Sequence, residues 1–201
     1  HMLAKLSENG TAGFVLANGA MSTNTTGEGA IRQKLVENDL VDCMIALPGQ
    51  LFFTTQIPVC LWFLSKNKQG DPQRGHRNRA NQTLFIDARK IGSMISRTQK
   101  ELSEEDIAGI AKTYHDWRSE TGDTYEDIAG YCKSASLEEI QKHDYVLTPG
   151  RYVGAAAIED DGIPFETKMT ELSQTLYAQM EESNQLDSVI RKNLETLGYG
   201  K

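Results

Sequence analysis

The stretch LVDCMIALPGQLFFTTQIPVCLWFL, residues 40–64, decides the fold. It contains two apolar runs, residues 40–47 and 58–64, each with the length and composition of a buried strand. The segment between them is too short to hold the crossover helix of about a dozen residues that joins parallel neighbours. We therefore expect the second strand to return antiparallel to the first.

Further strand and helix signals flank this stretch. Upstream, residues 13–17 form a short apolar run and residues 28–38 have one apolar helical face. Strand, helix and strand in this order predict a right-handed parallel βαβ unit. Downstream, the polar segment 66–82 leads to another apolar run at residues 83–88, for which we expect a second antiparallel return.

After residue 89 the pattern changes to helix. Ser103 and Asp106 have the spacing of a capping box, and apolar residues then repeat at helical spacing. Ser136 gives the same start signal for a shorter helix, and residues 143–154 are expected to be extended with a turn. The whole pattern predicts an α/β fold in which parallel strands end in antiparallel returns and a mainly helical region follows.

A long final helix is predicted after the acidic break at residues 159–161. Its apolar residues follow a 4-3 alternation that is interrupted where polar Gln179, Ser183 and Asn193 occupy core positions. An interrupted stripe favours docking on a partner or on the rest of this chain over a coiled coil of its own, and both alternatives stay open. The apolar members are Phe165, Met169, Leu172, Leu176, Leu186, Ile190 and Leu197.

The composition narrows the class of protein. The 201 residues carry a net charge of −7, so any contact with DNA must be local or supplied by a partner. No run approaches the roughly 20 apolar residues of a membrane span and the start does not resemble a secretory leader, so we expect a soluble, cytoplasmic protein without membrane contact. The odd set of Cys43, Cys60 and Cys132 predicts buried thiols in a reducing compartment.

No catalytic constellation is apparent in the sequence. None of the four histidines has a second histidine or a cysteine at metal-binding spacing, so no metal site is expected. Gly27-Glu28-Gly29 lacks the third glycine of a dinucleotide-binding loop and is interpreted as a flexible helix entry.

Two segments are candidate binding sites. Residues 48–58 follow a predicted parallel strand, at the sheet end where α/β proteins bind ligands, and Phe52 and Phe53 there fit a flat-ring pocket or simple core filling. Residues 66–79 form a basic loop whose spacing suits DNA phosphates, although a solvated loop fits equally well. Its candidate DNA-backbone residues are Lys66, Lys68, Arg74, Arg77 and Arg79.

Four stretches resemble a known family. They are GFVLANG at 13–19, EGAIRQKLVE at 28–37, VDCMIALPGQLFFTTQIP at 41–58 and YVLTPGRYV at 145–153. In this order they resemble the methylation subunits of type I restriction-modification systems, adenine-N6 DNA methyltransferases that use S-adenosylmethionine (SAM). The first three match the second half of the catalytic domain, and the last matches the segment that follows it.

The resemblance implies a fold and a division of the chain. The predicted strands at 13–17, 40–47 and 58–64 would be the last three of a seven-stranded, Rossmann-like methyltransferase sheet, so this chain would hold the carboxyl-terminal half. The implied domains are residues 3–90 for the end of the catalytic domain, 91–154 for a helical and extended extension, and 155–201 for a helix used in subunit assembly.

The resemblance also implies which parts are missing. In the family, the glycine-rich SAM motif and the Asn-Pro-Pro-Phe/Tyr motif that holds the target amine precede this region, and neither occurs in this sequence. We therefore expect a longer parent to methylate adenine with SAM, and this fragment to be inactive alone with no cofactor bound. By the resemblance Phe52, or alternatively Phe53, would stack on an adenine flipped from the duplex.

Partners are implied in the same way. In the family, two methylation subunits join one specificity subunit, a restriction subunit completes the complex, and DNA is bound through the complex. The final helix of this chain would pack on the helical spacers of the specificity subunit. Two alternatives stay open: a non-enzymatic α/β binding or scaffold domain, and part of a different adenine-specific DNA methyltransferase.

Overall fold

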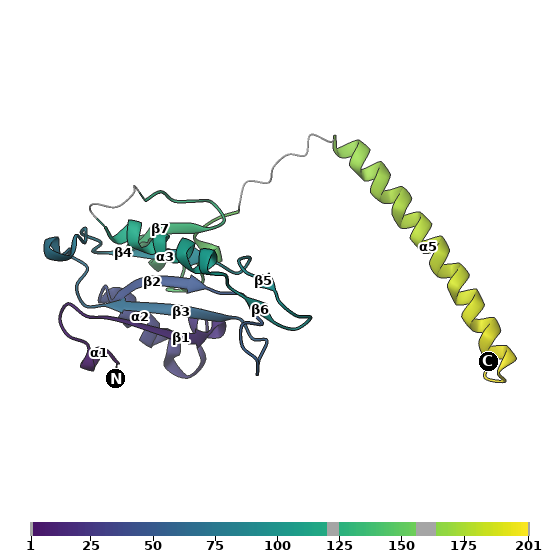
Figure 1. The fold of residues 1–201 in the computed structure, drawn as a ribbon, viewed down its shortest axis with the longest axis horizontal. Coiled ribbons are helices and arrows are strands. Elements are labelled where there is room, and N and C mark those ends of the chain that lie inside the picture. The colour runs from purple at the N-terminus through teal and green to yellow at the C-terminus, as the bar shows by residue number, and fades with distance from the viewer. Residues whose placement is uncertain (1, 120–124, 156–163, 201) are drawn as a thin grey trace. The chain divides into compact units, whose positions relative to one another are not determined.

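The computed structural model describes residues 2–119, 125–155 and 164–200, and the chain divides into two compact units, residues 1–157 and 158–201. The first unit is built on a five-stranded sheet with the strand order β1-β3-β2-β4-β7 (Figure 1). The strands are β1 Thr11–Ala17, β2 Val41–Ala46, β3 Val59–Ser65, β4 Gln82–Asp87 and β7 Cys132–Ser136.

Strand β3 lies between β1 and β2 and pairs antiparallel with both. Trp62 at its centre is opposite Phe14 on β1 and Met44 on β2. The prediction of an antiparallel return is therefore confirmed. The predicted βαβ unit needs a correction: β1 and β2 run in the same direction, but they are not neighbours because β3 is inserted between them.

Strand β4 corrects a second expectation. It runs opposite to β3, as predicted, but it pairs in parallel with β2, because β3 is already paired along both of its edges. Strand β7 was not predicted, since its sequence Cys-Lys-Ser-Ala-Ser has no apolar run. It pairs antiparallel with β4 and forms one edge of the sheet, where a short polar strand is tolerated.

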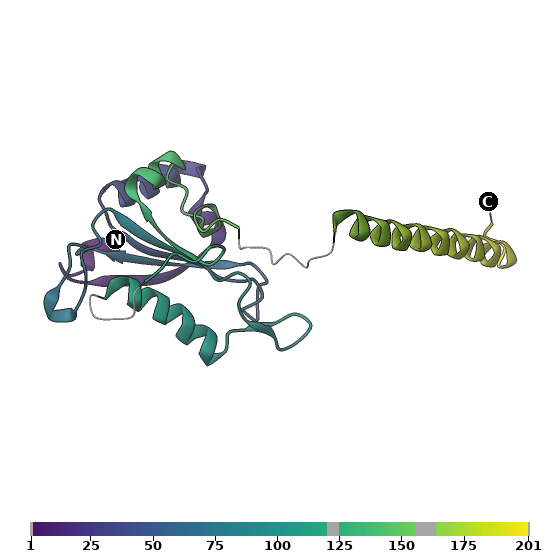
Figure 2. The same ribbon diagram turned by 90° about the horizontal axis from the view of Figure 1, so that it is seen from above.

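Helices cover both faces of this sheet (Figure 2). Helix α2 (Glu28–Glu37) and α4 (Leu137–Lys142) lie on one face and α3 (Glu104–Arg118) lies on the other. Ser103 caps α3 in a full capping box and Ser136 caps α4, so both predicted helix starts are confirmed. The remaining short elements are α1 Met2–Lys5, η1 Asn18–Met21, η2 Thr25–Gly27, η3 Pro72–Arg74, η4 Pro149–Arg151, β5 Ser93–Met94 and β6 Lys100–Glu101.

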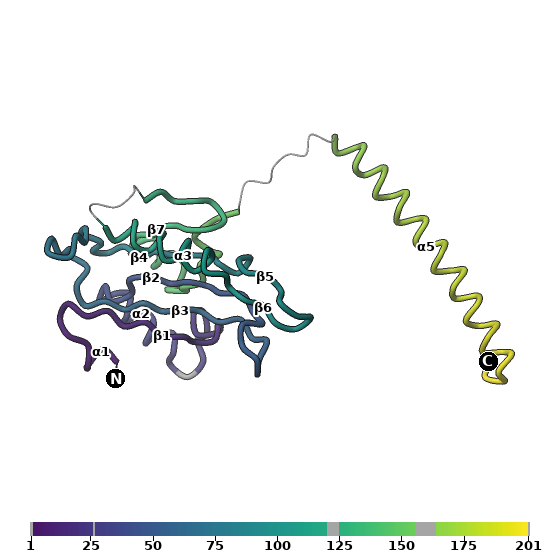
Figure 3. Tube along the Cα trace, viewed as in Figure 1, coloured from purple at the N-terminus to yellow at the C-terminus, as the bar shows by residue number. Residues whose placement is uncertain are grey.

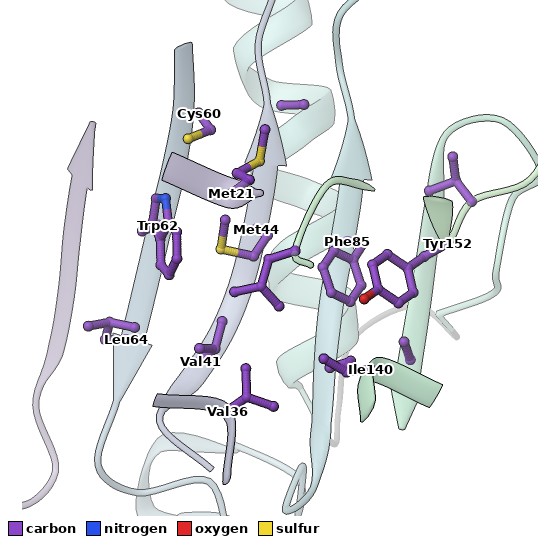
Figure 4. Close-up of a cluster of buried hydrophobic side chains, with 14 residues drawn as sticks. Met21, Val36, Val41, Met44, Cys60, Trp62, Leu64, Phe85, Ile140 and Tyr152 are labelled. Carbon is purple, nitrogen blue, oxygen red and sulfur yellow. The ribbon is translucent and has the colours of Figure 1, made fainter. Parts of the chain in front are cut away.

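The core on the α2 and α4 face is closed by the segment around η4. The Tyr152 ring stacks on Phe85 of β4 with ring centroids 3.8 Å apart (Figure 4). Buried Arg32 of α2 donates from Nε to the Tyr145 carbonyl at 2.6 Å and from Nη1 to the Thr23 carbonyl at 2.8 Å. These contacts tie the end of the first unit to its beginning. The turn predicted within residues 143–154 is confirmed by η4 at Pro149–Arg151.

The α3 face contains a buried polar network centred on Asp42. The register between β2 and β3 shifts at this residue, and such a bulge re-aims the side chain that it carries. Asp42 accepts from the Tyr114 hydroxyl of α3 at 2.6 Å and from Arg79 Nε at 3.2 Å. Burial and the adjacent carboxylate both raise the pKa of Tyr114, so its hydroxyl stays protonated and donates.

The predicted boundary at residues 90 and 91 does not separate compact units. Helix α3 packs on the sheet, and β7 extends it, so residues 91–154 belong to the same unit as β1, β2, β3 and β4.

The second unit contains one helix, α5, which spans Phe165–Thr196. Its 32 residues correspond to a length of about 48 Å. None of them is buried. Among the described residues, no helix is long and apolar enough to cross a membrane.

Removing the carboxylate of Asp42 should destabilise the first unit strongly. Asp42→Ala would leave the Arg79 charge, 1% exposed, and the Tyr114 hydroxyl without their partner. We expect a loss of about 3–5 kcal/mol in the free energy of unfolding, measured by urea denaturation. Asp116→Ala breaks an exposed pair with Lys112 on the same helix and should cost less than about 0.5 kcal/mol. Equal losses in the two variants would contradict this assignment.

Candidate nucleic-acid interface

The loop at residues 48–58 joins β2 to β3 and is folded as a small hairpin. Its neck is closed by hydrogen bonds from Leu47 N to the Val59 carbonyl at 2.9 Å and from Gln50 N to the Gln56 carbonyl at 3.3 Å. A further bridge joins Phe52 and Thr55. The loop therefore has a defined shape at the carboxyl end of β2.

Gly49 is required for the narrow neck of this loop. A Cβ atom at this position would lie 2.6 Å from the Gln56 carbonyl oxygen, which is backbone and has little freedom to move away. The next residue, Gln50, has a positive φ of 66°. Close approach followed by a left-handed residue turns the chain so that Phe52 and Phe53 are at the far end of the loop.

Both phenylalanines present apolar surface to solvent. Phe52 is 45% exposed and Phe53 is 90% exposed, whereas neighbouring Leu51 packs on the α3-face core. Simple core filling, one of the two interpretations left open by the sequence, does not describe Phe53. An exposed aromatic at the end of a shaped loop is suited to stacking on a flat ring.

In the basic loop between β3 and β4, two of the five predicted DNA-backbone residues are buried and paired inside the protein. Lys68 is 3% exposed; it forms an ion pair with Asp39 and donates from Nζ to the Val41 carbonyl at 2.9 Å. Burial lowers the pKa of the Lys68 amine, although the hydrogen bond that Lys68 donates to Asp39 opposes this effect. Arg79 is 1% exposed and is paired with Asp42. Neither cation has solvent-facing surface with which to contact a DNA phosphate.

The other three cations of this loop contact the protein itself. The Arg77 guanidinium lies 5.1 Å from the centre of the Trp117 ring, and its Nε donates to the Trp117 carbonyl. Lys66 Nζ donates to the Leu6 carbonyl at 2.6 Å and Arg74 Nη1 donates to the Asn9 carbonyl at 3.0 Å. The charges therefore hold the loop against α3 and the amino-terminal residues.

The basic loop and the Phe52 loop lie at opposite ends of the sheet. Residues 48–58 precede β3 and residues 66–81 follow it, so the length of this seven-residue strand, about 23 Å, separates them (Figure 3). The sequence offered them as two separate candidates, one for the flipped adenine and one for the DNA backbone. The structure does not bring them together.

A segment that the sequence analysis overlooked lies beside the Phe52 loop. Strands β5 and β6 form a two-stranded hairpin after β4, and Lys100 N on β6 donates to the Gln50 carbonyl at 2.9 Å. The hairpin was missed because the only apolar residues in 93–101 are the adjacent Met94 and Ile95, so the segment has no strand-like alternation. The basic residues of this segment were the feature of the sequence that could have marked it as a candidate DNA contact.

The described residues contain no cluster of three or more potential metal ligands. Cys43, Cys60 and Cys132 are free and buried, as predicted, and burial raises the pKa of each thiol. These thiols are therefore protonated at neutral pH and are poor nucleophiles.

Helix α5 presents all seven members of its predicted apolar stripe to solvent within its unit. Phe165 is 72% exposed and Leu197 is 70% exposed, while Met169 is the least exposed member at 44%. Leu194, five helical turns after Leu176, lies in line with the stripe, and exposed Met180 lies beside it. A face this broad is typical of a helix that packs in a bundle.

Comparison with known proteins agrees with this α/β architecture. Residues 1–161 match the family described as N-6 DNA Methylase. The chain belongs to this family, and its fold is the Rossmann-like fold of such methyltransferases. The chain is therefore classed with DNA methyltransferase domains.

Within the family, the similarity is to type I methylation subunits. The chain is 51% identical over 199 residues to the type I restriction enzyme HindI methylase subunit of Haemophilus influenzae, covering 99% of this chain and 42% of that protein. It also resembles the solved type I methyltransferase subunit of Streptococcus thermophilus, with 32% identity, a TM-score of 0.59 and coverage of 75% of this chain and 28% of that one.

A third similarity shows the fold alone. A chain from a structural study of complex assembly and conformational transition of the type I restriction-modification system is 13% identical, with a TM-score of 0.54, and covers 97% of this chain and 37% of that one. This chain thus spans less than half the length of each of these three proteins.

Proposed function

We propose that this chain is the carboxyl-terminal part of a type I methylation subunit whose longer form transfers the methyl group of SAM to N6 of adenine in DNA. The observation that carries the proposal is the family match together with an unfinished sheet. The chain would complete the methyltransferase sheet, supply one wall of the adenine pocket and dock the subunit on its partners. Alone, it would be inactive.

Strand β1 is the unfinished edge. It pairs with β3 on one side only, and its residues are mostly half-buried or exposed, including Val15 at 49% and Leu16 at 40%. An apolar seven-residue edge strand is a template for pairing with another strand. In the proposal, a strand from the rest of the parent subunit occupies this edge.

Each face of the sheet near this edge also has an apolar hollow that the helices do not fill. On the α2 face a hollow of about 420 Å³ is lined by Phe14, Leu16, Trp62 and other apolar side chains. On the α3 face a second hollow of about 420 Å³ is lined by Leu61, Phe63 and other apolar side chains. Sheets of this type bury both faces under helices, so the two hollows are consistent with missing layers that a longer chain would supply.

The sequence supports inactivity of the chain alone. The SAM-binding glycine motif and the Asn-Pro-Pro-Phe/Tyr motif of the family are absent from these residues. Since methyl transfer requires the amine and the cofactor methyl to be held in contact, the aromatic loop cannot catalyse it unaided. SAM is therefore proposed as the cofactor of the longer protein.

Phe52 is proposed to stack on the flipped adenine, with Phe53 as the alternative. In the longer subunit assembled with its specificity subunit, Phe52→Ala should remove about 1–3 kcal/mol of stacking, or about fivefold to 150-fold in affinity. The measurement is binding to duplex DNA in which the target adenine is mismatched and therefore easily flipped. Phe53→Ala, at the adjacent position, should change this affinity less than twofold. Unchanged affinity in Phe52→Ala would refute the assignment.

Helix α5 is proposed to pack on the helices of the specificity subunit, and the complex also recruits the restriction subunit. Its apolar stripe is exposed within its unit and is interrupted by polar Gln179 and Ser183, which suits a helix that completes a bundle with another chain. DNA would be bound through this complex.

Deleting residues 163–201 from the longer subunit should abolish co-purification with the specificity subunit. The paired substitution Leu176→Asp and Leu186→Asp should do the same, because it places charge on the stripe without touching the first unit. Gln174→Asp on the exposed helix should leave the complex intact. Retention of the complex by the deletion variant would rule out this role for α5.

A further inference from the structure

The segment that follows β4 is the most basic surface at the Phe52 end of the sheet. Residues 89–101 contain four basic residues and one acidic residue, a local charge of +3 on a chain whose net charge is −7. The basic residues are Arg89, Lys90, Arg97 and Lys100, and the acidic residue is Glu101. Such a local reversal of sign is what a DNA contact on an acidic protein requires.

The tip of the β5–β6 hairpin holds Arg97 in a closed turn. Ile95 N donates to the Gln99 carbonyl at 3.0 Å, and Ser96 Oγ accepts from Thr98 N at 3.3 Å and from Gln99 N at 3.1 Å. The hydroxyl of Ser96 thus replaces solvent at the backbone of the turn. Arg97 is presented from an ordered support.

The base of the hairpin is fixed against the Phe52 loop. Gly92 has a φ of 90°, and a Cβ atom there would lie 2.7 Å from the Glu101 carbonyl oxygen, so the two strands leave the sheet in close contact. Lys100 N donates to the Gln50 carbonyl in the neck of the Phe52 loop. The β5–β6 hairpin and the Phe52 loop are therefore held at a fixed distance from each other at one end of the sheet.

The cations of this segment differ in availability. Arg89 is engaged by Asp87, with Nη2 2.6 Å from Oδ2, and Lys100 Nζ donates to the Ile91 carbonyl at 3.2 Å. Arg97 is exposed, and within the described ranges it has no recorded ion pair or hydrogen bond from its side chain. Lys90 is also exposed. Arg97, at the tip of the hairpin, is therefore available to bind an anion from outside the protein.

We infer that the β5–β6 hairpin binds the phosphate backbone of the duplex next to the flipped adenine, with Arg97 as the main contact. The inference rests on the proposed function, since Phe52 or Phe53 must receive the base. A planar guanidinium on a short turn can engage a phosphate with two hydrogen bonds. The hairpin thus takes the role that the sequence assigned to the basic loop at the opposite end of the sheet.

The test is the salt dependence of DNA binding by the longer subunit assembled with its specificity subunit. Arg97→Gln should reduce the slope of log K against log salt by about one and lower affinity about fivefold at 0.15 M salt, the loss expected for one phosphate contact. Arg97→Lys, which keeps the charge, should restore most of the slope. Arg74→Gln, which removes an exposed arginine at the other end of the sheet, is the matched control and should behave as wild type.

The outcomes separate the two proposals. A wild-type slope in Arg97→Gln overturns the inference, whether or not Arg74→Gln changes, provided that the unmodified complex binds and methylates DNA. A reduced slope in Arg97→Gln alone, with thermal unfolding and partner binding unchanged, supports it. An unmodified complex that neither binds nor methylates DNA overturns the proposed function, and this inference falls with it.

Discussion

The insertion of β3 between β1 and β2 is the constraint on which the rest of this structure depends. Because β3 is paired along both edges, β4 cannot pair with it; β4 pairs with the far side of β2, and β1 keeps one free edge. The 48–58 loop and the 66–81 loop precede and follow β3, so they lie at opposite ends of the sheet. The open edge of β1 and the position of β4, from which the β5–β6 hairpin follows, depend on this pairing pattern.

A buried polar network stabilises that arrangement. Asp42 at the bulge of β2 joins three separate elements, because it accepts hydrogen bonds from Tyr114 of α3 and from Arg79 of the basic loop. Arg79, which the sequence presents as a candidate phosphate contact, is therefore paired with a carboxylate inside the protein. The network positions α3 over the sheet, and the segment before α3 then places the hairpin beside the Phe52 loop.

The sequence was most informative where a pattern is local. The apolar runs at β2 and β3, the short connection between them and the serine caps of α3 and α4 were predicted because each depends on neighbouring residues. Strand neighbours were not predictable in this way: the parallel β2–β4 pairing and polar β7 depend on which edges remain free. For the site, the loop with Phe52 and Phe53 was found, but the burial of Lys68 and Arg79 was not, since charge alone does not reveal an internal acidic partner.

In the proposed function, this chain carries one wall of the adenine pocket and the helix that docks on the partner subunit, and the cofactor-binding half lies in a longer parent. Calorimetric titration of SAM into the purified chain, with the longer protein as the control, tests it most directly. The account predicts no heat of binding for this chain and saturable binding for the longer protein. Saturable binding of SAM to this chain alone would contradict it, because a cofactor site would then exist within these 201 residues.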